Sequence, residues 1–149
     1  MNQVIFSPKG KVLKQFPADF VGEYVIPDSV SKIGFKAFAD CHGLTSVTIP
    51  NSVRTIELAA FVNCENLTSI TLPASIKHIG NGIFYQCDKL EKVSCLAPDL
   101  KKILIEKNTI TNTKFFGVEP QATLFVPKQA LSAYKKLVPW KNFKSIESI

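Results

Sequence analysis

Hydrophobic and polar positions follow one pattern that repeats through the central part of the chain. The segment from Leu44 to Asn66 reads LTSVTIPNSVRTIELAAFVNCEN, and the next 23 residues, LTSITLPASIKHIGNGIFYQCDK, keep its order of apolar and polar residues. A more divergent copy, VGEYVIPDSVSKIGFKAFADCHG, precedes both. Tandem units of equal length predict one small structural unit that recurs and stacks on its neighbours to complete a shared core.

The same residue types recur in phase in all three units. They are Pro27, Pro50 and Pro73; Ser29, Ser52 and Ser75; Ile33, Ile56 and Ile79; Phe38, Phe61 and Phe84; and Cys41, Cys64 and Cys87. A fixed period of 23 residues indicates a solenoid, and it lies within the range of leucine-rich repeats.

The first half of each unit has the alternation of a β-strand with one buried face. Leu44, Val47 and Ile49 are expected to point inward, and Ser46 and Thr48 outward. Stacked units would place such strands side by side in a parallel sheet, about 4.8 Å apart. The proline that follows ends the strand because it has no N–H to donate to the sheet.

In the second half, apolar residues are spaced by three or four, which is the period of a helix. The β-branched residues Val53 and Ile56 instead favour an extended chain at the start of this half. We therefore expect short helical or extended segments opposite the sheet, with any helix confined to about Leu58 to Asn63.

The N-terminal and fourth units depart from the repeat. Residues 1–19 predict two short strands joined by a turn, and we interpret them as an N-terminal cap over the open end of the core. Residues 20–96 hold the regular repeats, which include a fourth strand that begins at Leu90. Residues 97–121 keep apolar residues without the spacing, and they predict an irregular repeat.

Residues 122–149 form a different unit within the same single domain, residues 1–149. A strand ended by proline is expected at Ala122 to Pro127, and a helix with Ala130, Tyr134 and Leu137 on one face should follow. Pro139 would end this helix, and Trp140 and Phe143 would close the end of the solenoid, because large aromatic side chains bury much area. We interpret the segment as a strand–helix cap.

Composition and charge limit the function classes. A chain of 149 residues is long enough to bury roughly two thirds of its surface in one domain. No apolar run reaches the ~20 residues that a membrane helix needs, and the N-terminus lacks the apolar core of a signal peptide. The net charge of +6 comes mostly from dispersed lysines, with Arg54 as the one arginine. We interpret these lysines as a solvated surface and expect neither nucleic-acid binding nor membrane insertion.

The C-terminal segment carries a motif that accompanies the repeat. It comprises a strand ending in Val-Pro-Lys, an Ala-Tyr-Lys helix and a Trp-Lys-Asn-Phe closure: Val126, Pro127, Lys128, Ala133, Tyr134, Lys135, Trp140, Lys141, Asn142 and Phe143. Together with the repeat consensus, it closely resembles the BspA-like leucine-rich repeats of bacterial surface proteins.

This resemblance implies an α/β fold, a right-handed leucine-rich-repeat solenoid with a parallel sheet on one face and caps at both ends. It also implies an extracellular or cell-surface location and adhesion to host or partner proteins. The chain shows few full repeats and no leader, so a cytoplasmic location stays open.

Cysteine and histidine are the first candidates for chemistry. Cys41, Cys64 and Cys87 should stack in a column of small buried thiols, because parallel Cβ directions are unfavourable for disulfides. The spacing is not that of a zinc site. His42 follows a cysteine that should point inward, so a Cys–His nucleophilic pair is not expected, and His78 should be exposed.

No carboxylate recurs in phase through all three units, and no pair is positioned for acid–base work. The glycines belong to turns rather than to a phosphate-binding loop. We therefore predict no catalytic, metal-binding or cofactor-binding residues, and no enzyme.

The outward positions of the sheet remain as the candidate site for a protein partner. They are Glu23, Val25, Ser46, Thr48, Ser69, Thr71, Lys92 and Ser94. Solenoids use such extended surfaces for binding, but this one is mostly Ser and Thr. The main hypothesis is a non-enzymatic protein-interaction module that binds a protein, a host extracellular protein being one candidate. The alternative is a structural spacer of a larger surface protein, and the sequence does not define the oligomeric state.

Overall fold

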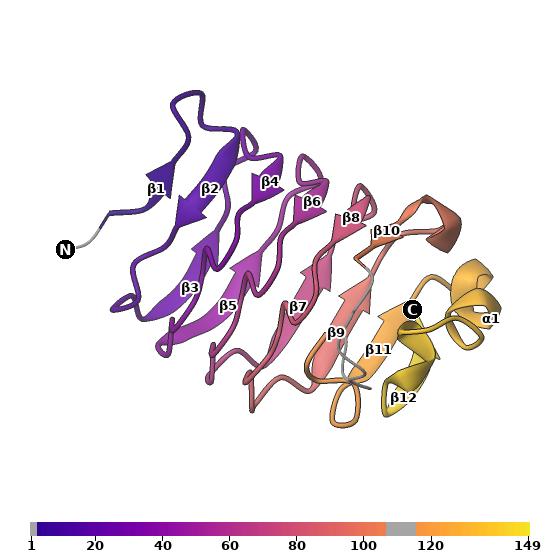
Figure 1. Cartoon of the computed structure of the whole chain (residues 1–149). Helices are drawn as coiled ribbons and strands as arrows, with labels where there is room; N and C mark the ends of the chain where they lie inside the picture. Colours follow the sequence, from indigo (N-terminus) through magenta and orange to yellow (C-terminus); the bar gives the residue numbers. More distant parts are fainter. Residues whose placement is uncertain (1–2, 107–115) are drawn as a thin grey trace.

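The computed structural model describes residues 3–106 and 116–149, which form a solenoid of stacked coils (Figure 1). Each regular coil contains a strand, a turn, a short second strand and a longer turn segment, which we call the turn side. The first strands of the coils, with the last strand of the chain, are the front strands: β3 (Gly22–Val25), β5 (Leu44–Thr48), β7 (Ser69–Leu72), β9 (Lys92–Cys95), β11 (Thr123–Val126) and β12 (Ser145–Ser148).

The second strands of the coils, with β1, form the rear sheet. Its members are β1 (Ile5–Phe6), β2 (Val12–Gln15), β4 (Lys32–Ile33), β6 (Thr55–Ile56), β8 (His78–Ile79) and β10 (Leu104–Ile105), in this order across the sheet. Every pairing is parallel except the β1–β2 hairpin, and Lys32, Thr55, His78 and Leu104 stand in register. The predicted repeat solenoid with parallel strands is confirmed.

The front strands form two ladders. β3 pairs with β5, and β7, β9, β11 and β12 form a four-stranded sheet. β7 lies beside β5 in the stack, but the two strands belong to different ladders. The front strands therefore lie side by side along the whole stack, but the backbone pairing between them is interrupted between β5 and β7.

The helix expected within Leu58 to Asn63 is absent, and this prediction was wrong. The turn side is built from turns, with left-handed backbone at Ala59 (φ 54°) and Asn63 (φ 62°). Alternate N–H groups bond to the next coil, Ala59 to the Asn81 carbonyl at 3.0 Å and Phe61 to the Ile83 carbonyl at 2.9 Å. The N–H groups between them close turns within the same coil. Inter-coil bonding thus takes every second donor that a continuous helix would need.

The core is a column of aromatic rings flanked by aliphatic residues. Phe38 and Phe61 stack at 4.8 Å between ring centroids, and Phe84 continues the column 6.0 Å from Phe61. All three are buried. The column begins at Phe16, 4.7 Å from Phe38, so the segment before the first regular unit contributes to the same core.

The irregular fourth coil keeps both of its strands. β9 is followed by the 3-10 helix η1 (Leu100–Lys102), and β10 then pairs with β8. Residues 107–115 of the expected irregular repeat lie outside the described residues. The boundaries that the sequence suggested for caps and repeats stay predictions, because pairing alone does not define folding units.

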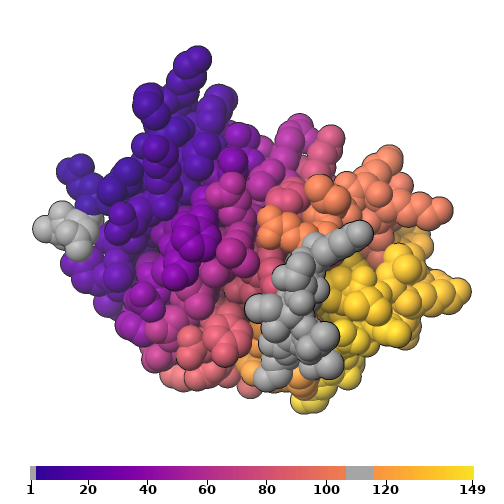
Figure 2. All heavy atoms as spheres, in the orientation of Figure 1, coloured from indigo at the N-terminus to yellow at the C-terminus, as the bar shows by residue number. Residues whose placement is uncertain are grey.

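The C-terminal segment packs against one end of the coils (Figure 2). After β11, the chain forms the 3-10 helix η2 (Lys128–Ala130), the short helix α1 (Leu131–Tyr134) and the 3-10 helix η3 (Trp140–Asn142). Trp140 and Phe143 are buried, as predicted, with ring centroids 4.8 and 5.4 Å from Phe116. Ala130 and Tyr134 of the predicted helical face are buried, whereas Leu137 is 45% exposed, because α1 ends at Tyr134 before the helix reaches it.

Candidate binding face

The eight predicted sheet-face residues all lie on the front strands, and none of them is buried. Glu23 is opposite Ser46 and Val25 opposite Thr48 in the first ladder. In the second ladder, Ser69 is opposite Lys92 and Thr71 opposite Ser94. The alternation read from the sequence thus placed the outward side chains correctly, and their binding role stays a hypothesis.

The face extends further than the sequence indicated. Thr123 and Phe125 continue the two rows on β11, and Ser145 and Glu147 continue them on β12. The signal for Phe125 was present, because Leu124 and Val126 alternate with it in a strand that was predicted. β12 was missed: its four residues, SIES, have no repeat phase and no proline after them.

These added strands form a shallow recess of about 340 Å³ at the C-terminal end of the face. Its lining combines predicted and missed residues: Asp88, Glu91, Lys92, Gln121, Thr123, Phe125, Lys144 and Glu147. The five charged side chains among them form no ion pair with another described residue. The recess therefore offers charged groups of both signs beside one partly buried aromatic ring, Phe125.

Hydrogen bonds hold part of this lining in place. The Thr123 and Ser145 hydroxyl oxygens are 3.0 Å apart, and the Ser145 hydroxyl donates to Glu147 Oε1 at 3.4 Å. Gln121 Nε2 lies 3.2 Å from the Cys87 carbonyl and 3.2 Å from the Leu90 carbonyl, so it fixes the turn before β9. Side chains fixed in this way lose less conformational entropy when a partner binds.

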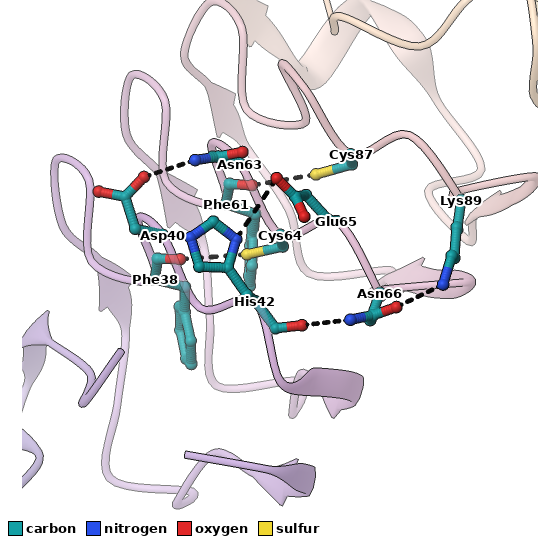
Figure 3. A network of polar contacts seen from close by, with 10 residues as sticks. All are labelled: Phe38, Asp40, His42, Phe61, Asn63, Cys64, Glu65, Asn66, Cys87 and Lys89. Carbon is teal, nitrogen blue, oxygen red and sulfur yellow. Dashed lines mark hydrogen bonds and ion pairs between the residues drawn. The ribbon is translucent and has the colours of Figure 1, made fainter. Parts of the chain in front are cut away.

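A second polar network runs along the turn side (Figure 3). Asn63 Nδ2 donates to Asp40 Oδ1 at 2.8 Å, Asn66 Nδ2 to the His42 carbonyl at 2.6 Å, and Lys89 Nζ to Asn66 Oδ1 at 2.6 Å. Each bond joins one coil to the next at in-phase or nearly in-phase positions. The network explains how the turns stack, and we assign it a structural role.

Histidine and cysteine are separated by this packing. The exposed His42 lies 3.6 Å from Glu65 Oε1, whereas the adjacent Cys41 is buried. His78 was expected to be exposed, but its side chain is only 26% exposed and lies 3.6 Å from Glu106. The rear-sheet register explains this position, because Thr55 and Leu104 flank His78 on the neighbouring strands.

The cysteine column is confirmed as buried free thiols. Cys64 Sγ donates to the Phe38 carbonyl at 3.1 Å, and Cys87 Sγ to the Phe61 carbonyl at 3.0 Å (Figure 3). The neighbouring thiols and burial together raise the pKa of Cys64, so the reactive thiolate is disfavoured. Across residues 3–106 and 116–149, no group of three or more His, Cys, Asp or Glu side chains could hold a metal ion.

Glu119 is a buried carboxylate, and its perturbed pKa makes it a site candidate. Burial raises its pKa, although hydrogen bonds from backbone N–H groups oppose the shift. Its two oxygens accept the N–H groups of Phe116 and Gly117. A fully buried group held by its own loop has no access to a substrate, so we assign it to loop structure.

The fold and the front face define the class of protein as a short leucine-rich-repeat solenoid. The BspA type leucine rich repeat region matches residues 15–123 in six copies, and the chain therefore belongs to this family. The sequence pattern alone had identified three full copies and a fourth strand. A comparison with curated proteins gave no match.

Solved structures of bacterial leucine-rich-repeat proteins are similar to this chain. A leucine rich cell surface protein from Faecalibacterium prausnitzii has 24% identity and a TM-score of 0.69, with 97% of this chain and 37% of that chain covered. A leucine-rich repeat protein from Eubacterium ventriosum has 17% identity and a TM-score of 0.68, with the same coverage.

A leucine rich repeat protein from T. pallidum has 18% identity and a TM-score of 0.62, with 97% of this chain and 78% of that chain covered. At these identities the likeness shows the fold alone. The chain also spans only 37% of the length of the first two proteins. In the part of the chain that the structure describes, no helix is long and apolar enough to cross a membrane.

Proposed function

We propose that this chain is a non-enzymatic protein-binding module at a bacterial surface, and that its front strands contact the partner. The recess around Phe125 is the observation that carries the proposal. It combines an aromatic side chain, charges that form no ion pair within residues 3–106 and 116–149, and hydrogen-bonded side chains on one open sheet. Aromatic anchors of this kind contribute strongly to protein interfaces.

The partner would lie along the rows of exposed residues that lead into the recess. Thr48 and Thr71 are exposed on β5 and β7, and Val25 is 67% exposed at the far end. Short side chains allow a partner surface to approach the sheet closely, and the recess would receive a larger side chain. We expect a host extracellular protein, in keeping with the cell-surface description of the F. prausnitzii protein.

Substitution of Thr48 and Thr71 by lysine tests this proposal. Both changes introduce long charged side chains on the front without disturbing the buried face. The double variant should fail to capture the extracellular proteins that the unchanged chain captures, and its melting temperature should stay the same. The matched control is the double variant Gln129→Lys and Ser132→Lys, which adds the same charge on exposed positions of the C-terminal segment.

Loss of capture by the front variant and retention by the control would support the proposal. Equal capture by both would exclude the front strands as the binding surface. The alternative is a structural spacer within a larger protein. The observation behind it is that the chain covers only 37% of the length of two similar structures. A spacer would capture no protein in a saturable manner.

A further inference from the structure

The corner between the front strands and the rear sheet carries a row of basic residues. Backbone hydrogen bonds define this row: Ser31 N–H to the Lys11 carbonyl at 2.8 Å, Arg54 to Ser31 at 2.9 Å, Lys77 to Arg54 at 2.8 Å and Leu104 to Lys77 at 2.7 Å. Successive bonds of this kind place the positions one above another on adjacent coils. In Figure 1 the corner follows the upper edge, from the hairpin before β2 to η1.

The side chains of this row are exposed and mostly without acidic partners. Lys11, Arg54 and Lys77 are exposed, and none forms an ion pair with another described residue. Lys102 continues the row on η1, where its side chain is 78% exposed despite a contact of 3.7 Å with Asp99. The turns at this corner span residues 7–11, 26–31, 49–54, 73–77 and 96–103, and their acidic residues are Asp28 and Asp99 alone.

Three of these cations surround one hollow. Arg54, Lys77 and Lys102 come from three successive coils and line a recess of about 270 Å³. The rest of its lining consists of Asp99, Ile76 and the small residues Ala74, Ser75, Ala97 and Pro98. Strand spacing places neighbouring coils about 4.8 Å apart, so the row from Lys11 to Lys102 runs for roughly 20 Å along the solenoid. The charges thus form a line rather than a scattered surface.

We propose that this basic row binds a linear acidic polysaccharide, with the chain of sugars parallel to the solenoid axis. The complementarity is one of charge and shape: a line of cations, interrupted at Ser31, faces a polymer that carries a sulfate or carboxylate on successive sugars. The small residues of the hollow leave room for a sugar ring between Arg54 and Lys102. The site is separate from the front strands, so it does not depend on the protein-binding role.

The lining favours a polysaccharide over a nucleic acid. Proteins that bind single strands combine basic residues with aromatic side chains on which the bases stack. The recess between Arg54 and Lys102 has no aromatic residue in its described lining. One arginine among lysines also offers little of the bidentate recognition on which base reading depends.

Heparin binding to the whole chain tests the proposal, with affinity measured from about 50 to about 300 mM NaCl. Affinity should fall steeply with salt, since binding to a polyanion releases counterions. The triple variant Arg54→Ser, Lys77→Ser and Lys102→Ser should bind about tenfold more weakly or worse at the lowest salt. Hyaluronan carries carboxylates but no sulfates, so its affinity shows whether carboxylates alone are enough for binding. Neutral dextran should not bind.

The matched control is Lys135→Ser, Lys136→Ser and Lys141→Ser, which removes the same charge from exposed positions of the C-terminal segment. It should retain nearly the full affinity for heparin. An equal loss in both triple variants, or no heparin binding at the lowest salt, would overturn the proposal. It would also fail if a single-stranded DNA oligonucleotide bound the row as tightly as heparin. The variant Thr48→Lys and Thr71→Lys should keep heparin binding, which separates this site from the proposed front interface.

Discussion

Phe61 packs between Phe38 and Phe84 in the aromatic column, and it is fully buried. The recurrence of phenylalanine every 23 residues made this position predictable, because a solenoid core repeats its largest side chain at each coil. The inward thiols of Cys64 and Cys87 were predictable for the same reason. Their hydrogen bonds to carbonyls of the preceding coil depend on turn geometry, which residue spacing does not define.

Truncation of Phe61 to alanine should lower the free energy of unfolding by about 3–5 kcal/mol, since it leaves a cavity in the column. The exposed Phe35 provides the control, and Phe35→Ala should have little effect. Denaturant titration measures both. A loss under about 1 kcal/mol for Phe61→Ala would contradict the proposed core.

Glu57 joins two coils on the rear side. Its carboxylate accepts hydrogen bonds from the Lys32 ammonium at 2.9 Å and from the Phe35 N–H at 2.8 Å. The hydrogen bond from Lys32 holds the pKa of Glu57 below the ordinary 4.5. A carboxyl with a lowered folded pKa stabilises the fold above its unfolded pKa. This contribution is lost as the pH falls through the folded value.

Unfolding free energy should therefore fall as the pH is lowered from about 6 to about 3, and Glu57→Gln should make this decline shallower. Glu23→Gln, which removes an exposed carboxylate without an ion pair among described residues, is the control. Denaturant midpoints across this range give the comparison. An unchanged slope in Glu57→Gln would show that the contact does not persist in solution.

At the scale of elements, strands were predicted better than turns. The alternation in residues 44–49 and the proline after it define β5, whereas the spacing of three and four in residues 58–63 suggested a helix that does not form. The in-phase position of Ala59 is Gly82, also left-handed with φ 61°. This glycine was a signal for a turn, and inter-coil bonding could not be seen in the sequence.

Two opposite substitutions test the left-handed turn. Ala59→Gly should stabilise the protein by roughly 0.5–1 kcal/mol, because glycine removes the strain of a positive φ. Gly82→Ala should destabilise the protein by about 1 kcal/mol, because alanine is strained at this positive φ. A steric clash would not contribute, since an added Cβ meets nothing closer than 3.8 Å. Chemical denaturation measures both. A helix at 58–63 would instead make Ala59→Gly destabilising, and a helix at the in-phase residues 81–86 would make Gly82→Ala stabilising.

At the scale of the whole molecule, the coils and the C-terminal segment share one core. Phe116 contacts Trp140 and Phe143, and the Phe84 N–H donates to the Phe116 carbonyl at 2.8 Å. The buried aromatics of this segment were predictable. β12 and the extension of the front face were not predictable. The short polar strand β12 forms because it pairs with β11, and its own sequence has no strand pattern.

Removal of residues 122–149 should expose the last coil, since it deletes β11, β12 and the aromatic side chains packed on Phe116. We expect the fragment 1–121 to aggregate or to lose cooperative unfolding. Size-exclusion chromatography and thermal denaturation would show this. A soluble, cooperative fragment would contradict the closing role of the C-terminal segment.

The central claim is that the front strands bind a protein partner through the recess. It is tested most directly by the affinity of a captured partner for Phe125→Ala, compared with Leu104→Ala on the rear sheet, where Leu104 is 65% exposed. Loss of an aromatic anchor should weaken binding by more than about 1 kcal/mol, roughly a factor of five to ten. Leu104→Ala should leave the affinity unchanged. Equal affinity for the unchanged chain and Phe125→Ala, or a loss confined to Leu104→Ala, would contradict the account.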